Sequence, residues 1–127
     1  MPSQFQTTSH TRGAVRTHVA LTAGTNGAVP SSFTRARDVY SITKGTHTYA
    51  IKLARGATAL LDWSCKVIQA TPDVAGAWEA KVIAEDVAGS TRTITIGFFD
   101  KDGAGVDMAT GDKLSCTFEL KTSPGLA

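Results

Sequence analysis

The stretch RDVYSITKGTHTYAIKL, residues 37–53, contains two runs in which apolar and polar residues alternate. The apolar members fall on one side of each run: Tyr40 and Ile42 in the first, and Tyr49, Ile51 and Leu53 in the second. A period of two is typical of a strand with one buried face, and a short Gly-containing loop between two such runs is typical of a β-hairpin. This stretch therefore predicts an antiparallel hairpin around which the rest of the chain is organised.

The same alternation recurs along the chain. It predicts strands over residues 15–21, 61–67, 78–85, 93–99 and 113–121. About seven or eight short strands separated by turn signals are typical of an antiparallel sandwich or jelly roll. We predict an all-β fold: a single antiparallel β-sandwich, jelly-roll-like, over residues 15–121, with an extended N-terminal arm over 1–14 and a C-terminal tail over 122–127.

Residues 71–78 fit two patterns. Thr71-Pro72 is typical of a helix start, and Val74 and Trp78 have the i, i+4 spacing of a helix. Gly76 would weaken that helix by about 1 kcal/mol relative to Ala. The alternation of apolar and polar residues that begins at Trp78 is as long as the helical pattern. We therefore predict a loop through Ala77 followed by a strand that ends at Glu85.

The window TITIGFF, residues 93–99, is the most strand-prone and least charged part of the chain. If it were exposed, it would promote aggregation, and Arg92 and Asp100 flank it with charge. We predict that this strand is central in a sheet or covered at a subunit contact.

The composition is that of one globular domain. The chain has 127 residues, of which 42% are hydrophobic. No apolar run reaches the 18 or so residues of a membrane span, and the N-terminus lacks the basic-then-apolar layout of a signal peptide. We expect folding in a cytoplasm and no membrane partner.

The two cysteines, Cys65 and Cys116, each lie in an alternating run beside inward apolar residues. This pattern favours free buried thiols that act as small hydrophobes. A disulfide is the alternative, which a reducing cytosol disfavours. Two cysteines far from any histidine in sequence do not make a zinc site.

Positive charge is concentrated near the N-terminus. Residues 1–37 contain four arginines and no acid, a net charge of +4, whereas residues 38–127 contain nine Lys or Arg against eleven Asp or Glu, a net charge of −2. A basic leader favours an acidic partner surface, with a solvated tail as the alternative. Its arginines are too sparse for a nucleic-acid arm, so we expect no direct nucleic-acid binding. The candidate partner-binding residues are Phe5, Arg12, Arg16, Arg35 and Arg37.

The loop from Asp100 to Asp107 matches part of a calcium-binding loop. Asp, Asp, Gly and an apolar residue stand at positions one, three, six and seven of the EF-hand pattern, but Ala104 and Gly111 stand where ligands are needed. A solvated hairpin loop is the default, and Asp100, Asp102 and Asp107 are a weak alternative cation site.

No residue set specifies a reaction. His10, His18 and His47 lie in separate segments without a nucleophile in a recognisable setting. The carboxylates of Glu79 and Glu85 accompany Lys81 as a solvent face rather than as an acid and base pair. We expect no cofactor and no enzymatic activity.

The segment NGAVPSSFTRARDVYSITKGTHTYAIKL, residues 26–53, resembles a family of small structural proteins from tailed bacteriophages. The resemblance continues through residues 59–61, 63–70 and 110–114 and the last strand. It implies a virion protein with a compact β fold, a capsid decoration or cement protein that binds the major capsid protein as a homotrimer or other homo-oligomer. It also implies location on the capsid surface after synthesis in the host bacterial cytoplasm.

Two alternatives follow from the same sequence. The chain can be another virion component, such as a small major coat protein or a tail or head-completion protein. It can also be a carbohydrate-binding β-sandwich in which Trp63 or Trp78 lines a groove, although a tryptophan in the core is the more common case.

Overall fold

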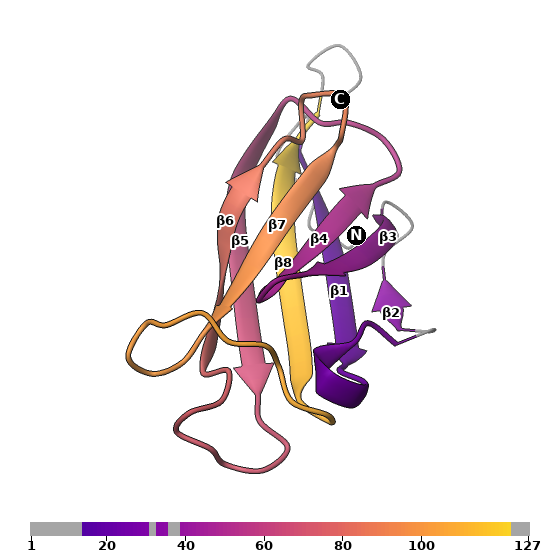
Figure 1. The fold of residues 1–127 in the computed structure, drawn as a ribbon. Coiled ribbons are helices and arrows are strands. Elements are labelled where there is room, and N and C mark those ends of the chain that lie inside the picture. Colours follow the sequence, from indigo (N-terminus) through magenta and orange to yellow (C-terminus); the bar gives the residue numbers. More distant parts are fainter. Residues whose placement is uncertain (1–13, 31–32, 36–38, 123–127) are drawn as a thin grey trace, which may run out of the picture.

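Eight strands and one short 3-10 turn form the part of the chain that the computed structural model describes, which is residues 14–30, 33–35 and 39–122 (Figure 1). The elements are β1 (Ala14–Thr22), η2 (Thr25–Gly27), β2 (Thr34–Arg35), β3 (Val39–Gly45), β4 (Thr48–Leu53), β5 (Ala59–Ile68), β6 (Glu79–Glu85), β7 (Thr93–Phe99) and β8 (Lys113–Lys121). No helix among the described residues is both long and apolar enough to cross a membrane.

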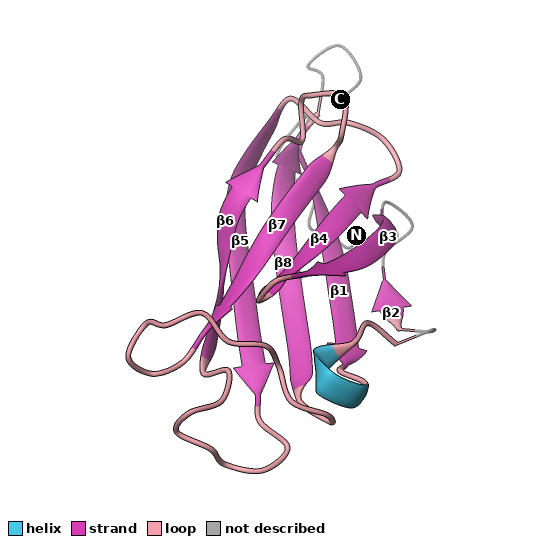
Figure 2. Cartoon of the chain, in the orientation of Figure 1, coloured by secondary structure: helices cyan, strands magenta, loops and turns pink. Residues whose placement is uncertain are grey.

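The strands form two four-stranded antiparallel sheets that pack face to face (Figure 2). Sheet A has the order β2-β1-β8-β5, and sheet B has the order β3-β4-β7-β6. The predicted all-β antiparallel sandwich is confirmed. The hairpin of residues 37–53 is β3–β4, and TITIGFF is β7, an inner strand of sheet B as predicted.

The core lies between the sheets, and alternation in the inner strands fills it. Tyr49, Ile51 and Leu53 of β4 are buried, and their ladder partners on β7 include Ile94 and Ile96. Burial of a side chain of this size contributes about 1.5–3 kcal/mol. The other buried apolar residues of the inner strands are Ala14, Val19, Leu21, Phe98, Leu114, Cys116, Phe118 and Leu120.

Three edge strands contain a β-bulge, and each bulge turns one large apolar residue outward. The register shifts between Val39 and Ser41 on β3, between Leu60 and Asp62 on β5, and between Val82 and Ala84 on β6. The extra residues are Tyr40, Leu61 and Ile83, which are 64%, 50% and 51% exposed. A bulge adds one residue to one strand only, so alternation changes phase there.

The inward positions predicted for Tyr40 and Leu61 are therefore wrong. Val39 and Leu60 take those places, opposite Leu53 and Leu120. The preference for core tryptophans also fails, because Trp63 is 38% exposed and Trp78 is 53% exposed. The Trp63 side chain points to the same side of sheet A as that of its ladder partner Phe118. Because β5 is an edge strand, other residues cover Trp63 only in part.

The segment before β6 is a loop, as predicted, rather than a helix. Residues 69–78 contain turns and bends only. They join the edge strand of sheet A to the edge strand of sheet B on the same side of the sandwich, where β5 and β6 contact each other. This connection carries two large exposed apolar residues, Val74 and Trp78.

Candidate functional site

The predicted partner-binding residues are only partly described by the structure. Phe5, Arg12 and Arg37 lie outside the described residues. Arg35 is in β2, where its backbone pairs with Val19 of β1. Arg16 is exposed on the outer face of sheet A, directly opposite Glu119 of β8. The structure thus places one side chain of this set, and it gives no grouping of the five.

The outer face of sheet A is polar and charged. Cross-strand rows place Arg16 beside Glu119 and Glu119 beside Asp62, and His18 Nδ1 lies 3.5 Å from Thr117 Oγ1. An open hollow of about 180 Å³ lies on this face. Its lining residues are Arg16, Asp62, Trp63, Ser64, Thr117 and Glu119. This arrangement offers hydrogen-bond donors and acceptors, and Trp63 borders the hollow, although its side chain turns to the same side of the sheet as that of Phe118.

The outer face of sheet B contrasts with that of sheet A, because small uncharged residues occupy its centre. One row across the sheet consists of Thr43, Ala50, Thr95 and Ala84. The lysines on this face lie toward its margins, where Lys52 covers the Tyr40 ring at 5.7 Å and Lys81 covers the Phe99 ring at 5.3 Å. Such a face loses little hydration when another surface covers it.

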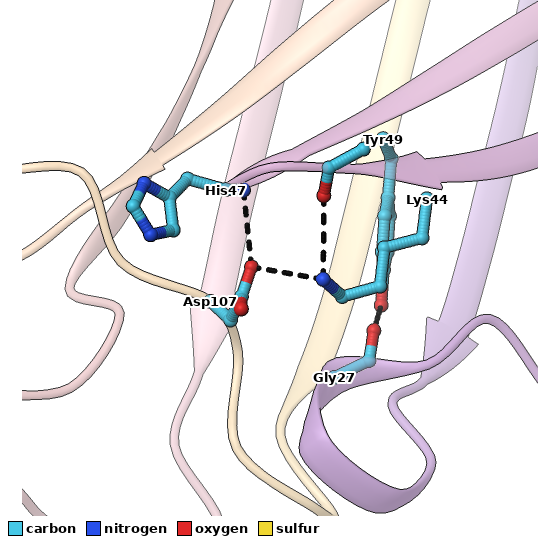
Figure 3. Close-up of polar contacts among 6 residues, drawn as sticks. Gly27, Lys44, His47, Tyr49 and Asp107 are labelled. Atoms are coloured by element: carbon cyan, nitrogen blue, oxygen red, sulfur yellow. Dashed lines mark hydrogen bonds and ion pairs between the residues drawn. The ribbon is translucent and has the colours of Figure 1, made fainter.

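Asp107 holds the β3–β4 turn through two hydrogen bonds (Figure 3). Its Oδ1 accepts hydrogen bonds from Lys44 Nζ at 3.1 Å and from the His47 backbone N–H at 3.1 Å. Those bonds hold the β3–β4 turn, where His47 has a φ of 57°. Asp100 Oδ1 instead accepts the backbone N–H groups of Asp102 and Ala104, both at 2.9 Å. Within the described ranges, no group of three His, Cys, Asp or Glu side chains is placed to hold a metal ion.

Tyr49 connects the core to η2 in the same region (Figure 3). Its hydroxyl donates to the Gly27 carbonyl at 2.6 Å, and its ring meets Phe98 edge-on at 4.9 Å between centroids. Burial raises the pKa of Tyr49 to about 12, with smaller contributions from the negative charges of Asp107 and Asp112. The phenol is therefore a fixed hydrogen-bond donor of the fold.

The two cysteines are free and face each other across β5 and β8. Cys65 and Cys116 are direct ladder partners; Cys116 is buried and Cys65 half-buried. A hydrogen bond between the thiols raises the pKa of Cys116, which burial raises further, and the same contact lowers the pKa of Cys65. Both thiols are free and face inward, but of the two predicted buried thiols only Cys116 is buried, and the sequence did not reveal that they are neighbours.

Sequence reasoning missed two polar residues that organise the loops at one end of the sandwich. Asp112 is buried and accepts the backbone N–H groups of Ala70 at 3.0 Å and Ala109 at 2.9 Å. Gln69 bonds to the backbone of its own loop through both side-chain atoms, as described below. The sequence signal for Asp112 was its place between Gly111 and the start of the last strand. In the structure, Gly111 has a φ of 88° and β8 begins at Lys113, the residue after Asp112.

Large exposed apolar side chains are unevenly distributed. Among the described residues, six of the eight belong to β5, β6 and the connection between them. These six are Leu61, Trp63, Ile68, Val74, Trp78 and Ile83, and the other two are Val15 and Tyr40. Single exposed apolar residues are common, but their concentration along the β5–β6 edge is typical of a contact region, in which Leu61 turns out of sheet A and Ile83 out of sheet B.

Comparison with known proteins gives no relative from which a function can be transferred. The chain matches no family model, no curated protein and no solved structure.

Proposed function

We propose that this chain is a virion structural protein of a tailed bacteriophage. In this proposal it is a capsid decoration or cement protein that binds the major capsid protein and stabilises the head as a homotrimer or other homo-oligomer. The observation that carries the proposal is the concentration of exposed apolar side chains along β5, β6 and their connection. A domain whose role is contact needs such a surface, and burial stabilises contact by about 25 cal/mol per Å² of apolar area.

The bulged edges support binding through side chains rather than through strand addition. A regular edge strand invites pairing with another chain, and a bulge interrupts the row of unpaired backbone groups. Here β3, β5 and β6 are bulged edges, and each turns an apolar side chain outward at the bulge. A domain of this kind binds a shell through its side chains, and its bulged edges keep copies of the domain from pairing strand to strand in an open-ended chain.

A shell presents many identical sites, and this changes what weak contacts can do. Once one subunit of an oligomer is bound, its neighbours bind at a high effective concentration. A protein that binds only the assembled shell also stabilises it by mass action. In this proposal Phe5, Arg12, Arg16, Arg35 and Arg37 contribute shell contacts, and no nucleic acid or membrane is a partner.

The test uses heads assembled from the major capsid protein of the same phage and lacking this chain. The purified protein should sediment with these heads and raise the temperature at which they open. Absence of binding to intact heads, together with absence from purified particles, would reject the proposal. Electron microscopy of the isolated protein separates the alternatives, because closed shells would identify a coat protein and small oligomers fit decoration.

The hollow on sheet A favours one second candidate, a carbohydrate-binding domain. Arg16, Asp62 and Glu119 line the hollow with polar groups of the kind that bind a sugar, and the partly exposed Trp63 borders it. A glycan panel read by tryptophan fluorescence tests it. Glycan-dependent quenching that Asp62→Ala abolishes would favour this candidate, and no response to any glycan would remove it.

A further inference from the structure

The connection between β5 and β6 holds three large apolar side chains in solvent. Ile68 ends β5, Val74 lies within the connection, and Trp78 immediately precedes β6. They are 60%, 66% and 53% exposed, although each belongs to a residue type that is usually buried. We call Ile68, Val74 and Trp78 the loop patch.

The side chain of Gln69 clasps this connection. Its Nε2 donates to the carbonyls of Asp73 at 2.9 Å and Ala77 at 3.0 Å, and its Oε1 accepts the Asp73 N–H at 3.1 Å. Every residue of the loop patch is the immediate chain neighbour of a residue in this clasp: Ile68 of Gln69, Val74 of Asp73, and Trp78 of Ala77. Gly76 leaves room for the clasp, because a Cβ there would lie 3.0 Å from Gln69 Nε2.

The connection is also fixed to the body of the domain at both ends. Ala70 donates its N–H to the buried Asp112 carboxylate, Ala77 is fully buried, and Trp78 donates its N–H to the Phe99 carbonyl at 2.7 Å. A loop held in this way loses little conformational entropy when it binds. The three apolar side chains are thus presented from a pre-organised backbone, as at the centre of a protein interface.

Charge restricts the chemistry of the partner. Asp73 is the only ionisable residue in residues 69–78, and its Oδ1 accepts the Ala75 N–H at 3.0 Å. The connection itself thus has no positive side chain that would select phosphate groups, and Lys113, the ladder partner of Ile68, places a positive charge at its margin. A tryptophan with two aliphatic neighbours fits an uncharged apolar depression on a protein.

The loop patch and Ala14, the first residue of β1, lie at opposite ends of sheet A. Ile68 pairs with Lys113 and lies in the same row as Thr22, whereas Ala14 pairs with Lys121 at the other end of sheet A. Nine residues of strand span about 27 Å. In Figure 1 the β5–β6 connection and the end of β8 accordingly lie at opposite ends of the domain.

The size of the loop patch indicates which partner covers it, a second free copy of this chain or a subunit of an assembled shell. Its exposed surface is roughly 300 Å², whereas a stable complex buries about 800 Å² on each partner. It is therefore too small to hold a dimer of free copies, but it is sufficient as one contact among several on an array of identical subunits.

We propose that the loop patch is a second attachment point to the shell, which inserts into an uncharged apolar depression of a capsid subunit. This inference rests on the proposed function and deepens it, because a protein that cements two subunits needs two separated contacts. The loop patch supplies one of these contacts at the end of the domain opposite Ala14.

The test compares binding of three forms of the full chain to heads that lack it. The forms are wild type, the double variant Val74→Ser with Trp78→Ser, and the control Tyr40→Ser, which removes an exposed aromatic residue from β3 at the other edge of sheet B. Copies bound per head are measured by sedimentation as a function of protein concentration. We expect the double variant to bind at least tenfold more weakly and the control to bind like wild type.

Equal urea midpoints for the three forms show that folding is not the cause of a difference. If wild type binds heads and the double variant binds equally well, the inference is overturned and the proposed function stands. If wild type does not bind heads, both fail. If sedimentation equilibrium shows an oligomer of the free protein that the double variant dissociates, the occupant is a second copy, and the proposed attachment to the shell is overturned.

Discussion

Because of Tyr49, the free energy of unfolding of this domain should fall as the pH becomes alkaline. Its hydroxyl is buried and donates to the Gly27 carbonyl at 2.6 Å, and its pKa is raised to about 12. The pKa of tyrosine in the unfolded chain is about 10. The folded state therefore favours the neutral phenol. The stability from this preference is fully present below about pH 10 and is lost as the pH rises through about 12.

The magnitude follows from the size of the pKa shift. Two pKa units at about 1.4 kcal/mol each give up to about 2.7 kcal/mol lost between pH 10 and pH 12. Tyr49→Phe removes both the ionisable group and the hydrogen bond, so near neutral pH it should cost about 1–2 kcal/mol. In the alkaline range the variant should lose less than wild type, so the two unfolding free energies should approach each other and cross before about pH 12.

Urea unfolding followed by circular dichroism, repeated from neutral pH to about pH 12, measures this difference. Lysines and other groups titrate equally in both forms, so the difference between wild type and Tyr49→Phe isolates the Tyr49 phenol. Tyr40→Phe is the matched control, because Tyr40 is exposed on β3. Parallel curves for wild type and Tyr49→Phe would refute the reasoning.

Four further predictions concern stability and redox chemistry. The Thr17 hydroxyl is buried without a partner among the described residues, so Thr17→Val should stabilise by about 1 kcal/mol in urea titrations, whereas Thr22→Val on the exposed end of β1 should change little. Asp112→Asn should lower the unfolding free energy by about 2 kcal/mol, because one amide oxygen cannot accept both N–H groups; an unchanged melting temperature would contradict this. Gly27→Ala should destabilise more than Gly103→Ala: both glycines have positive φ, but a Cβ at Gly27 would meet the Met108 carbonyl oxygen at 2.5 Å, and one at Gly103 has nothing described within 4 Å. Diamide, as oxidant, should convert Cys65 and Cys116 to an intramolecular disulfide with loss of two thiol hydrogens, detected by thiol titration and mass, and Cys65→Ser should leave the Cys116 thiol reduced.

Alternation predicted the inner strands well because both of their neighbours fix the register. In β8, Leu114, Cys116, Phe118 and Leu120 are all buried, as their spacing indicates. The edge strands β3, β5 and β6 depart from the rule because each contains a bulge. In hindsight each bulge coincides with two adjacent apolar residues: Val39-Tyr40, Leu60-Leu61 and Val82-Ile83. A period of two cannot place both members of such a pair inside, and the free edge lets one turn outward. The same signal also occurs at Phe98-Phe99 without a bulge, because inner β7 is paired on both sides.

The loop patch could not be predicted from spacing, because the pattern that marks it is also typical of a helix. Gln69, Asp73 and Ala77 recur every four residues, as do Val74 and Trp78, and this spacing is what an amphipathic helix shows. In the structure the same spacing comes from an amide side chain that binds the backbone four and eight residues later. A helix would satisfy those carbonyls itself and bury its apolar stripe against the core. The clasp satisfies them through Gln69 and leaves the apolar side chains outside, so the Gln69 side chain contributes to making this stretch a contact surface rather than core. Gln69→Leu, which keeps the volume and removes the bonds, should therefore weaken binding to heads even though every residue of the loop patch remains, whereas unchanged binding would show that the clasp has no part in presenting the surface.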